Sequence, residues 1–300
     1  MALNKAVFKT RALTALIFVA VMLVGLLWNF YAFLLLFSII HIGCWFEYLK
    51  ITELINGTTI DKGIKNFIIF CGFTLFLVLG LQHHGFNFYA TIAGFVINLK
   101  YPLWIFLFIC LGILLVQNKQ INNGAKKMIL LGFVYISLSF TAYLYLKDYY
   151  EYTYLGTLDK NSNILGVVVP CAIIFAIWIN DTMAYVVGSF IGKTPFSKIS
   201  PKKTWEGTIG GALLCVLVTG LLGYFLPVTQ NLSVKHWIAI GLICAVFGTL
   251  GDLLESKIKR TANIKDSGSF MPGHGGFLDR FDSLLIAAPA VWIYFKVFVL

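Results

Sequence analysis

Residues 12–28 read ALTALIFVAVMLVGLLW, and after one asparagine residues 30–47 read FYAFLLLFSIIHIGCWFE. Each stretch can cross a hydrocarbon core, because a transmembrane helix needs about 17–25 mostly apolar residues. Further stretches of this kind follow at 67–81, 101–117, 128–146, 164–180, 209–226, 237–253 and 283–299. The pattern predicts an all-α, polytopic integral membrane protein with about nine transmembrane helices.

The composition supports this fold class. Of the 300 residues, 59% are hydrophobic and only 12% are charged, whereas soluble domains carry about 25% charged residues. A soluble domain could not bury this much apolar surface, so a soluble enzyme, a disordered chain and a disulfide scaffold are excluded. The six cysteines lie in or beside apolar stretches without a CxxC pair. We interpret them as small buried hydrophobic residues.

Three segments need separate interpretation. The stretch 67–81 is short for a span, and we expect it to extend through Gln82. The segment 86–98 is short and aromatic, which favours an interfacial or re-entrant segment over a tenth span. Three basic residues precede the first span, as they would in a signal peptide. No small-residue cleavage site follows them, so we expect an uncleaved first helix.

The basic residues predict the orientation. With nine spans and a cytoplasmic N-terminus, 18 of the 23 Lys and Arg residues fall on the cytoplasmic side, which is a positive-inside distribution. The net charge of +10 therefore indicates membrane orientation rather than binding of nucleic acid. We expect two parts: residues 1–160 form an N-terminal scaffold of five spans, and residues 161–300 form a catalytic part of four spans with cytoplasmic polar segments.

The acidic residues cluster near the cytoplasmic ends of the last four spans. Seven of the 13 fall between residues 181 and 282, and these are Asp181, Glu206, Asp252, Glu255, Asp266, Asp279 and Asp282. On the predicted topology none of these seven lies at mid-membrane, where transporters and pumps usually place ionisable groups. The distribution favours an enzyme that acts on a molecule delivered from the cytosol to the membrane surface.

The stretch 252–282 reads DLLESKIKRTANIKDSGSFMPGHGGFLDRFD. If the eighth helix continues into it, Asp252, Ser256 and Lys259 share one helical face. Glu255 and Lys259 also form an i, i+4 pair, so an ordinary surface ion pair is an alternative interpretation of part of this pattern.

Asp279 and Asp282 are three residues apart at the start of the ninth predicted helix. Two carboxylates on one helical face offer hard oxygen ligands to Mg²⁺, which prefers a few carboxylates plus substrate phosphates. The PGHGG loop before them has accessible backbone N–H groups and suits phosphate binding at a helix N-terminus. His274 lies among its glycines with no apolar surface to pack on, so we expect it to contact a phosphate.

The segment 192–207, GKTPFSKISPKKTWEG, has two interpretations. Lys202, Lys203 and Thr204 follow a proline and precede a helix, and basic groups beside a hydroxyl fit a polyphosphate. Alternatively the segment is a positive-inside loop in which Thr204 caps the helix and Glu206 lies in its first turn.

Asn180, Asp181 and Thr182 interrupt the apolar stretch that ends at residue 180. They could cap a helix at that point. An acidic residue at the end of a span beside two polar residues is more often functional in membrane proteins, however.

These residues resemble the signature of the CDP-diacylglycerol synthases, also called phosphatidate cytidylyltransferases. The matching positions are Ser256, Lys259, Arg260, Lys265, Asp266, Gly268, His274, Gly275, Gly276, Asp279, Arg280, Phe281 and Asp282. Every spacing of the signature is met over 27 residues. The segments 180–185 and 199–207 are also similar to the family, so the resemblance covers the C-terminal part of the chain.

The resemblance implies a reaction in which CTP and phosphatidate give CDP-diacylglycerol and pyrophosphate with Mg²⁺; a second cation is an open alternative. It also implies a bacterial inner-membrane enzyme of phospholipid biosynthesis, often a homodimer, with its active site at the cytoplasmic face. The acyl tails of the substrate must stay in lipid while its headgroup reaches the polar segments. We therefore expect a side opening between helices.

The resemblance and the chemistry of the residues together predict three sets of site residues. The metal ligands are Asp252 and Asp279, with Asp282 as a third ligand or as a residue that orients the others. The catalytic set is Lys259, Arg260, Lys265, Asp266, His274 and Asp279. The substrate-binding set is Asp181, Lys202, Lys203, Thr204, Gly275, Gly276 and Arg280. Asp266 either pairs with Lys265 or Arg280 or is another metal ligand.

Two rival functions remain at this stage. A CTP-dependent lipid kinase would transfer the γ-phosphate to a lipid alcohol and would need a general base for that hydroxyl. A lipid transporter or scramblase would use the basic segments only to bind anionic headgroups. The transporter tolerates Asp279→Asn, because binding a headgroup needs no carboxylate, whereas the enzyme loses activity.

Overall fold

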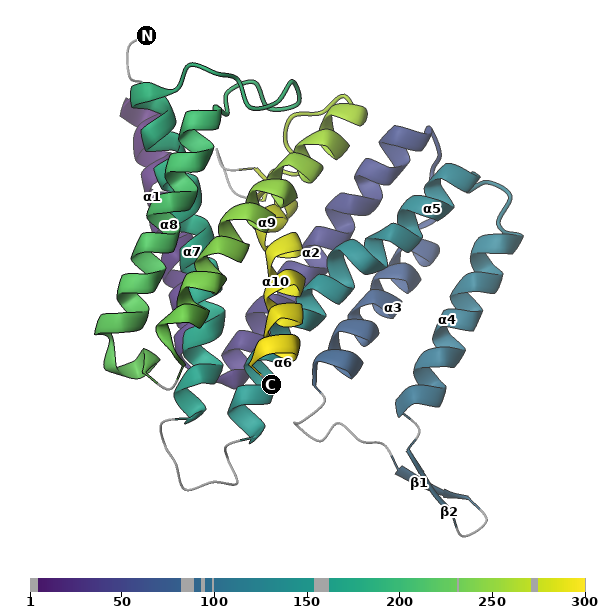
Figure 1. Ribbon diagram of the computed structural model, residues 1–300. Helices are drawn as coiled ribbons and strands as arrows, with labels where there is room; N and C mark the ends of the chain where they lie inside the picture. The colour runs from purple at the N-terminus through teal and green to yellow at the C-terminus, as the bar shows by residue number, and fades with distance from the viewer. Residues whose placement is uncertain are drawn as a thin grey trace.

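The computed structural model describes residues 5–81, 89–92, 95–98, 100–153, 162–230, 232–270 and 275–299, and these form a bundle of long helices (Figure 1). The helices are α1 (Lys5–Leu27), α2 (Phe30–Asn56), α3 (Lys62–Gly80), α4 (Lys100–Gln117), α5 (Asn123–Gly132), the π-helix η1 (Phe133–Leu138), α6 (Ser139–Thr153), α7 (Ser162–Ile191), α8 (Trp205–Phe225), the short 3₁₀ helix η2 (Pro227–Thr229), α9 (Val234–Thr261) and α10 (Leu278–Phe298). The segments α5, η1 and α6 follow one another without a break.

The predicted fold class is confirmed. Within the described residues, seven helical segments are long and apolar enough to cross a membrane, and two shorter apolar helices cover Leu13–Leu27 and Trp104–Gln117. Each of these coincides with one of the stretches predicted from the sequence. The protein is therefore an α-helical, multi-pass membrane protein. The exact number of nine spans and the division at residue 160 stay predictions.

Two local predictions are modified. Helix α3 ends at Gly80, so it does not extend through Gln82, which itself lies outside the described residues. The helix gains its length at the other end, where the Asp61 side chain accepts a hydrogen bond from the Gly63 N–H and caps it. In the segment 86–98, β1 (Tyr89–Ile92) and β2 (Phe95–Asn98) pair as an antiparallel hairpin. The described residues of that segment thus form no tenth spanning helix, and its place at the membrane interface stays a prediction.

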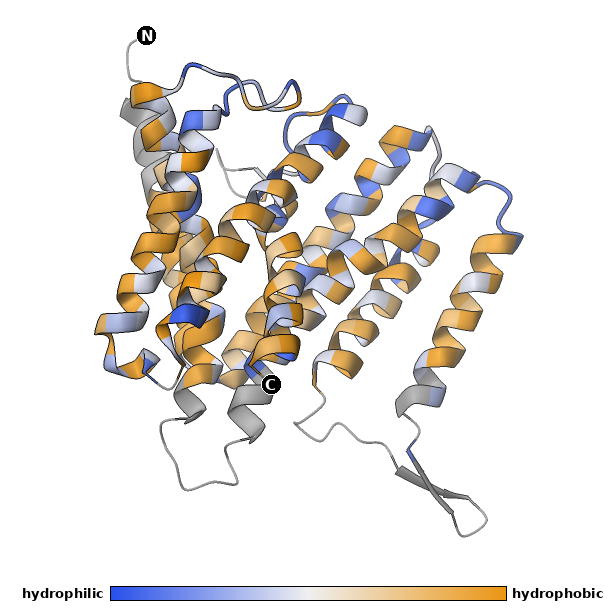
Figure 2. Ribbon diagram, in the orientation of Figure 1, coloured by the Kyte–Doolittle hydropathy of each residue, from blue (hydrophilic) through white to orange (hydrophobic). Residues whose placement is uncertain are grey.

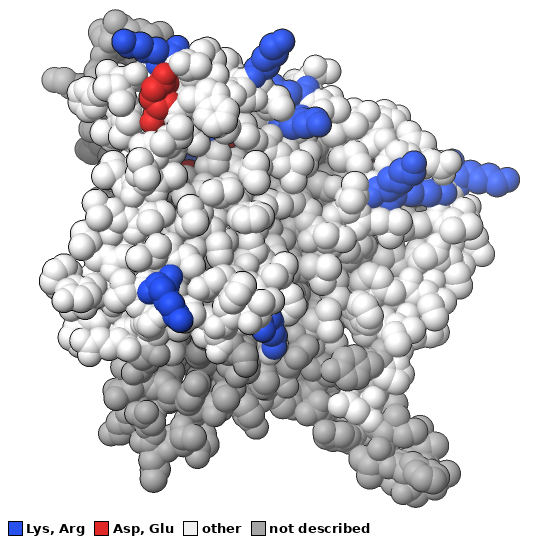
Figure 3. Space-filling view, in the orientation of Figure 1, with Lys and Arg blue, Asp and Glu red and all other residues white. Residues whose placement is uncertain are grey.

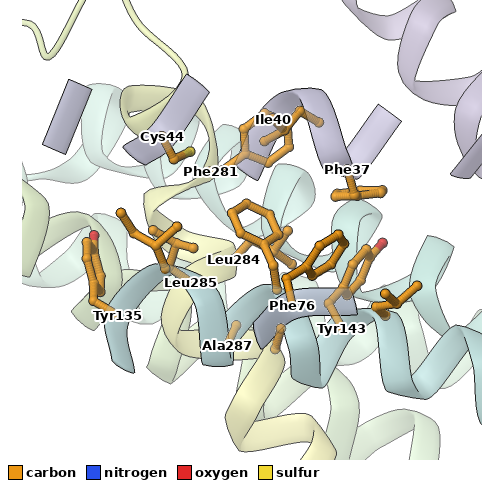
Figure 4. Packing of buried hydrophobic residues seen from close by; sticks show 14 of the residues in the cluster. Phe37, Ile40, Cys44, Phe76, Tyr135, Tyr143, Phe281, Leu284, Leu285 and Ala287 are labelled. Atoms are coloured by element: carbon orange, nitrogen blue, oxygen red, sulfur yellow. The ribbon is translucent and has the colours of Figure 1, made fainter. Parts of the chain in front are cut away.

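The core lies where α2, α6 and α10 meet, and Figure 4 shows these side chains pointing toward one another. The Phe37 ring of α2 lies 4.8 Å from the Tyr143 ring of α6 and 6.3 Å from the Phe281 ring of α10, centroid to centroid. The Tyr143 hydroxyl donates to the Pro170 carbonyl, which ties α6 to α7. Such aromatic contacts contribute about 0.5–1.5 kcal/mol each beyond area burial. They hold the first turns of α10 in place.

Polar residues gather at one end of the bundle. The α7–α8 and α9–α10 connections and the start of α5 share this end in Figure 1, and Figure 2 shows blue residues there above a broad apolar belt. On the face drawn in Figure 3, most Lys and Arg side chains lie along the same upper edge. A membrane protein needs this arrangement, because charged groups are costly within the hydrocarbon region.

Candidate active site

A polar pocket of about 470 Å³ opens at this end of the bundle. It is formed by α7, the α7–α8 connection, α8, α9 and α10, and its lining includes Asn180, Asp181, Lys202, Lys203, Thr204, Thr249, Asp252, Asp279, Arg280 and Asp282. The structure thus brings together eight of the residues predicted from the sequence. Residues from position 252 onward thus line one pocket with residues of both upstream polar segments.

Close approach of α9 and α10 sets two carboxylates side by side in the pocket. A Cβ on Gly251 would lie 2.4 Å from the Asp282 carbonyl oxygen, so only glycine allows this contact. Asp252, the next residue, forms an ion pair with Lys203 at 2.5 Å and accepts a hydrogen bond from the Ser256 hydroxyl at 3.2 Å. Asp282 Oδ1 accepts from the Ser283 N–H at 2.7 Å.

Asp181 reaches the pocket from the middle of a helix. Helix α7 continues to Ile191, so the interpretation of Asp181 and its neighbours as a helix cap is wrong. The side chain of Asn180 is 2% exposed, and its Nδ2 donates to Thr249 at 3.4 Å. The Oδ1 atom of Asn180 is buried without a hydrogen-bond partner. Asn180 therefore belongs to the site, although the sequence indicated it only as a polar residue that interrupts an apolar stretch.

The α7–α8 connection confirms the structural interpretation of segment 192–207, and polyphosphate binding by this segment stays a prediction. The Thr204 hydroxyl accepts a hydrogen bond from the Gly207 N–H at 3.2 Å, so Thr204 caps α8 as the structural interpretation predicted. Glu206 accepts hydrogen bonds from the Lys193 and Thr194 N–H groups at 3.1 Å, which pins the start of the connection to α8. These bonds hold the backbone, while the side chain of Lys202 lines the pocket with Lys203 and Thr204.

Asp279 also lines the pocket, but its oxygens already accept hydrogen bonds. Oδ1 accepts from Lys259 Nζ at 2.5 Å, and Oδ2 accepts from the Ser267 N–H, the Ser267 hydroxyl and the Gly276 N–H at 2.7–2.9 Å. Lys259 also pairs with Glu255 at 2.7 Å. The side chain of Glu255 is fully buried and that of Lys259 is 12% exposed, so the surface ion pair considered from the sequence is wrong.

Glu47 of α2 also hydrogen-bonds with the residues around Asp279. This residue was not predicted from the sequence. It accepts hydrogen bonds from the Ser267 hydroxyl at 2.6 Å and from the Phe277 and Leu278 N–H groups at 2.9 Å, so it caps the N-terminus of α10. A Cβ on Gly276 would lie 2.2 Å from a Glu47 oxygen, which explains the glycine there. The only signal in the sequence was a lone acid at the end of an apolar stretch. We call Glu47, Glu255, Lys259, Ser267 and Asp279 the closed cluster.

The remaining predicted residues lie away from the pocket lining. Arg260 is exposed and donates to the Ile264 carbonyl at 3.3 Å, and Lys265 and Asp266 are exposed on the α9–α10 connection. Gly275 has a φ of +85°, a left-handed conformation that favours glycine. His274 lies outside the described residues.

The pocket suits a magnesium ion held jointly with a substrate. Among the residues that the structure describes, no three His, Cys, Asp or Glu side chains form a metal site on their own. The pocket lining does hold the carboxylates of Asp181, Asp252 and Asp282 and the unpartnered Asn180 Oδ1. Mg²⁺ commonly takes one or two carboxylates and completes its shell with water and phosphate oxygens. This donor set therefore fits Mg²⁺ once a phosphate is present.

Comparison with known proteins identifies the class. The model of the Cytidylyltransferase family matches residues 9–298, so the chain belongs to this family. It is 46% identical over 116 residues to phosphatidate cytidylyltransferase 4, chloroplastic, of Arabidopsis thaliana, a match that covers 39% of this chain and 29% of the relative. It is also 46% identical over 114 residues to a phosphatidate cytidylyltransferase of Staphylococcus haemolyticus, covering 38% of this chain and 43% of that protein. The matches thus span less than half of these relatives.

Proposed function

We propose that this protein is a phosphatidate cytidylyltransferase, which transfers CMP from CTP to phosphatidate and gives CDP-diacylglycerol and pyrophosphate. The observation that carries the proposal is the polar pocket, where Asp181, Asp252 and Asp282 lie with Lys202 and Arg280. Carboxylates together with cations at the end of a membrane bundle suit a reaction between two phosphates, one of them on a lipid. Membership of the family and the names of the relatives support the same reaction.

The reaction does not require a strong general base. An oxygen of the phosphatidate phosphate attacks the α-phosphorus of CTP, a new P–O bond forms, and the bond to the β-phosphate breaks with its electron pair leaving on pyrophosphate. The attacking phosphomonoester is already anionic near neutral pH, because its second pKa is about 6. The site must therefore align highly charged groups and neutralise their charge.

The cations of the pocket supply part of that neutralisation. Lys202 and Lys203 stand on a connection that hydrogen bonds hold against α8, and they would bind the β- and γ-phosphates of CTP. Arg280, from the first turn of α10, would bind the lipid phosphate, since its planar guanidinium can contact two phosphate oxygens at once. Lys203 would then exchange its pair with Asp252 for a phosphate contact.

The acids of the pocket divide into two roles. Asp252 and Asp282, with Asp181 and Asn180 beside them, would hold Mg²⁺. When bound, this ion would stabilise the charge that develops on the leaving pyrophosphate. We assign Asp279 a positioning role, because hydrogen bonds from Lys259, Ser267 and Gly276 already use its oxygens. It would fix the α9–α10 connection and thereby the placement of Arg280.

The proposal is tested with purified protein in detergent, phosphatidate, Mg²⁺ and CTP labelled at the α-phosphate. We expect label in the lipid and one pyrophosphate released for each labelled lipid. A CDP product without label in the lipid would replace the proposal by a lipid kinase. Neither product from well-folded protein, judged by a cooperative unfolding transition, would favour binding or transport of anionic lipid.

We also propose that the pocket faces the cytoplasm of a bacterial inner membrane. The positive-inside distribution supports this orientation, since on the predicted nine-span topology 18 of the 23 Lys and Arg residues fall on that side. Accessibility of single cysteines placed at Lys198 and at Lys235 in sealed cells, to a thiol reagent that does not cross membranes, tests it. Labelling at residue 198 but not at 235 would overturn the proposal.

The homodimer common in the family stays a proposal that the mass of the purified particle can test.

A further inference from the structure

Two apolar grooves lie on the membrane-facing surface of the described residues. The first, which we call the α1–α2 groove, has about 390 Å³ and is framed by α1, α2 and the start of α10. The second, the α6–α10 groove, has about 870 Å³ and lies between η1 and α6 on one side and α9 and α10 on the other. Either could be the side opening expected for a lipid substrate. Their relation to the polar pocket differs.

The α1–α2 groove meets the polar pocket at one side chain. Arg280 lines both, and it is the only described residue that lines the pocket and either groove. Gly276, whose N–H donates to Asp279, also lines the α1–α2 groove. A molecule with an anionic head at Arg280 could therefore extend an apolar tail directly into this groove. The α6–α10 groove offers no such junction.

The geometry points to the α1–α2 groove as the seat of an acyl chain of the phosphatidate substrate, with Arg280 binding the phosphate where groove and pocket meet. This inference rests on the proposed function. The groove walls are apolar, from Ile17 and Val21 on α1 to Leu36 and Ile39 on α2. An acyl chain matches this lining, whereas a nucleotide or a second phosphate does not.

The groove opens sideways to the bilayer. Ile17, Val21 and Ile39 are each 50–55% exposed, so lipid can reach the groove between α1 and α2. Its floor contains Phe18, whose ring lies 6.1 Å from both the Trp178 and Phe281 rings. From Thr14 to Val21 the α1 wall rises about 10 Å, at 1.5 Å per residue. This length holds the part of a chain nearest the headgroup and leaves the remainder in the bilayer.

The groove would orient the substrate more than attract it. Lipid tails are as apolar as these side chains, so moving a tail from bilayer to groove gains little hydrophobic free energy. Alignment of the reacting groups is what raises the rate. We therefore expect a blocked groove to lower kcat/KM for long-chain substrates and to leave binding of CTP intact.

Val21 and Val24 provide a matched pair for the test. Both lie on α1 and are 50% and 53% exposed, but only Val21 lines the groove. Ile293 is 55% exposed and lines the α6–α10 groove, so Ile293→Trp blocks the competing site in the same way. The three Trp variants and the unchanged protein are assayed with dioleoyl and dihexanoyl phosphatidate at varied CTP. A short chain reaches less far down the groove.

We expect Val21→Trp to lower kcat/KM for dioleoyl phosphatidate at least ten-fold and for dihexanoyl phosphatidate less than three-fold, with an unchanged KM for CTP. Val24→Trp should match the unchanged protein. Equal effects of Val21→Trp and Val24→Trp would overturn the inference, and a selective effect of Ile293→Trp would move the chain to the other groove. If Val21→Trp changed the particle mass without a kinetic effect, the groove would instead be an interface between two copies of the chain, and the inference would be overturned. If the unchanged protein forms no CDP-lipid from either substrate, it is the proposed function that fails.

Discussion

The polar pocket and the closed cluster share Asp279, but their other carboxylates have different surroundings. In the pocket, Asp181, Asp252 and Asp282 line a space large enough for phosphates. In the closed cluster, Glu47 and Asp279 accept hydrogen bonds from serine, lysine and backbone groups of the α9–α10 connection. A carboxylate whose acceptor positions are filled stabilises a loop. One that faces a polar pocket can bind a cation or a substrate.

The largest effect on stability is expected from Lys259→Met in the closed cluster. Lys259 bridges Glu255 and Asp279, which are 0% and 5% exposed, so its removal leaves two buried carboxylates without their cation. Breaking a buried ion pair in this way costs about 3–5 kcal/mol. The measurement is the free energy of unfolding by denaturant in detergent micelles.

The double variant Lys259→Met/Glu255→Met is the control for this prediction. It removes one of the stranded charges and should recover part of the lost stability, since buried pairs replaced by apolar residues are often tolerated. Equal stability of Lys259→Met and the unchanged protein would contradict the closed cluster, and Lys259 would return to the catalytic set predicted from the sequence.

Asp282→Asn should lower activity without lowering stability, and this outcome distinguishes the pocket from the closed cluster. The amide keeps an oxygen that can accept from the Ser283 N–H, so the fold should be retained. It loses the negative charge needed beside Asp252, and we expect kcat to fall about 10²-fold, the magnitude seen when one preorganised electrostatic contact is lost. Steady-state kinetics with a melting curve checks this. A stable variant with full kcat would remove Asp282 from the proposed metal ligands.

Asp279→Asn is the matched variant in the closed cluster. It removes the charge that pairs with Lys259, and we expect it to lower both activity and melting temperature. Loss of activity at an unchanged melting temperature would instead favour the metal role predicted from the sequence.

Local spacing made the positions of several site residues on their helices predictable. Asp252 and Lys259 fall on α9 with the i, i+7 spacing, and Asp279 and Asp282 fall in the first turns of α10 with the i, i+3 spacing, as predicted. The spans were predictable for the same reason, because apolar length is a local property. Lys202 and Thr204 could be placed at a helix start, but their position beside α9 depends on packing of α7 against α8.

The hydrogen bonds of Glu47 in the closed cluster could not be predicted, because they join distant parts of the chain. Glu47 and Ser267 are 220 residues apart, and nothing in the local sequence around either indicates the other. The role of Asp279 was obscured for a related reason. Whether a carboxylate is saturated depends on loop N–H groups, such as those of Ser267 and Gly276, that only the folded connection aims at it.

A smaller effect is expected from Lys202→Ala in the pocket. Its side chain is exposed and lines the pocket without a structural partner to strand, so stability should not change. Loss of one charge-assisted phosphate contact should raise the KM for CTP about ten-fold, which corresponds to about 1.4 kcal/mol. Lys198→Ala on the same connection is the control, because Lys198 is exposed but does not line the pocket. If both variants raised the KM equally, the effect would be that of net charge near the site.

The smallest effect is expected at Thr204, which lines the pocket and also caps α8. Thr204→Ala removes the hydroxyl that accepts from the Gly207 N–H, and losing such a cap costs about 1 kcal/mol. Thr204→Ser keeps the hydroxyl and should restore the unfolding free energy. If Thr204 only caps the helix, Thr204→Ala leaves the KM for CTP unchanged when the KM is measured well below the melting temperature of the variant. A raised KM in the alanine variant, restored by serine, would show that the same hydroxyl also contacts the nucleotide.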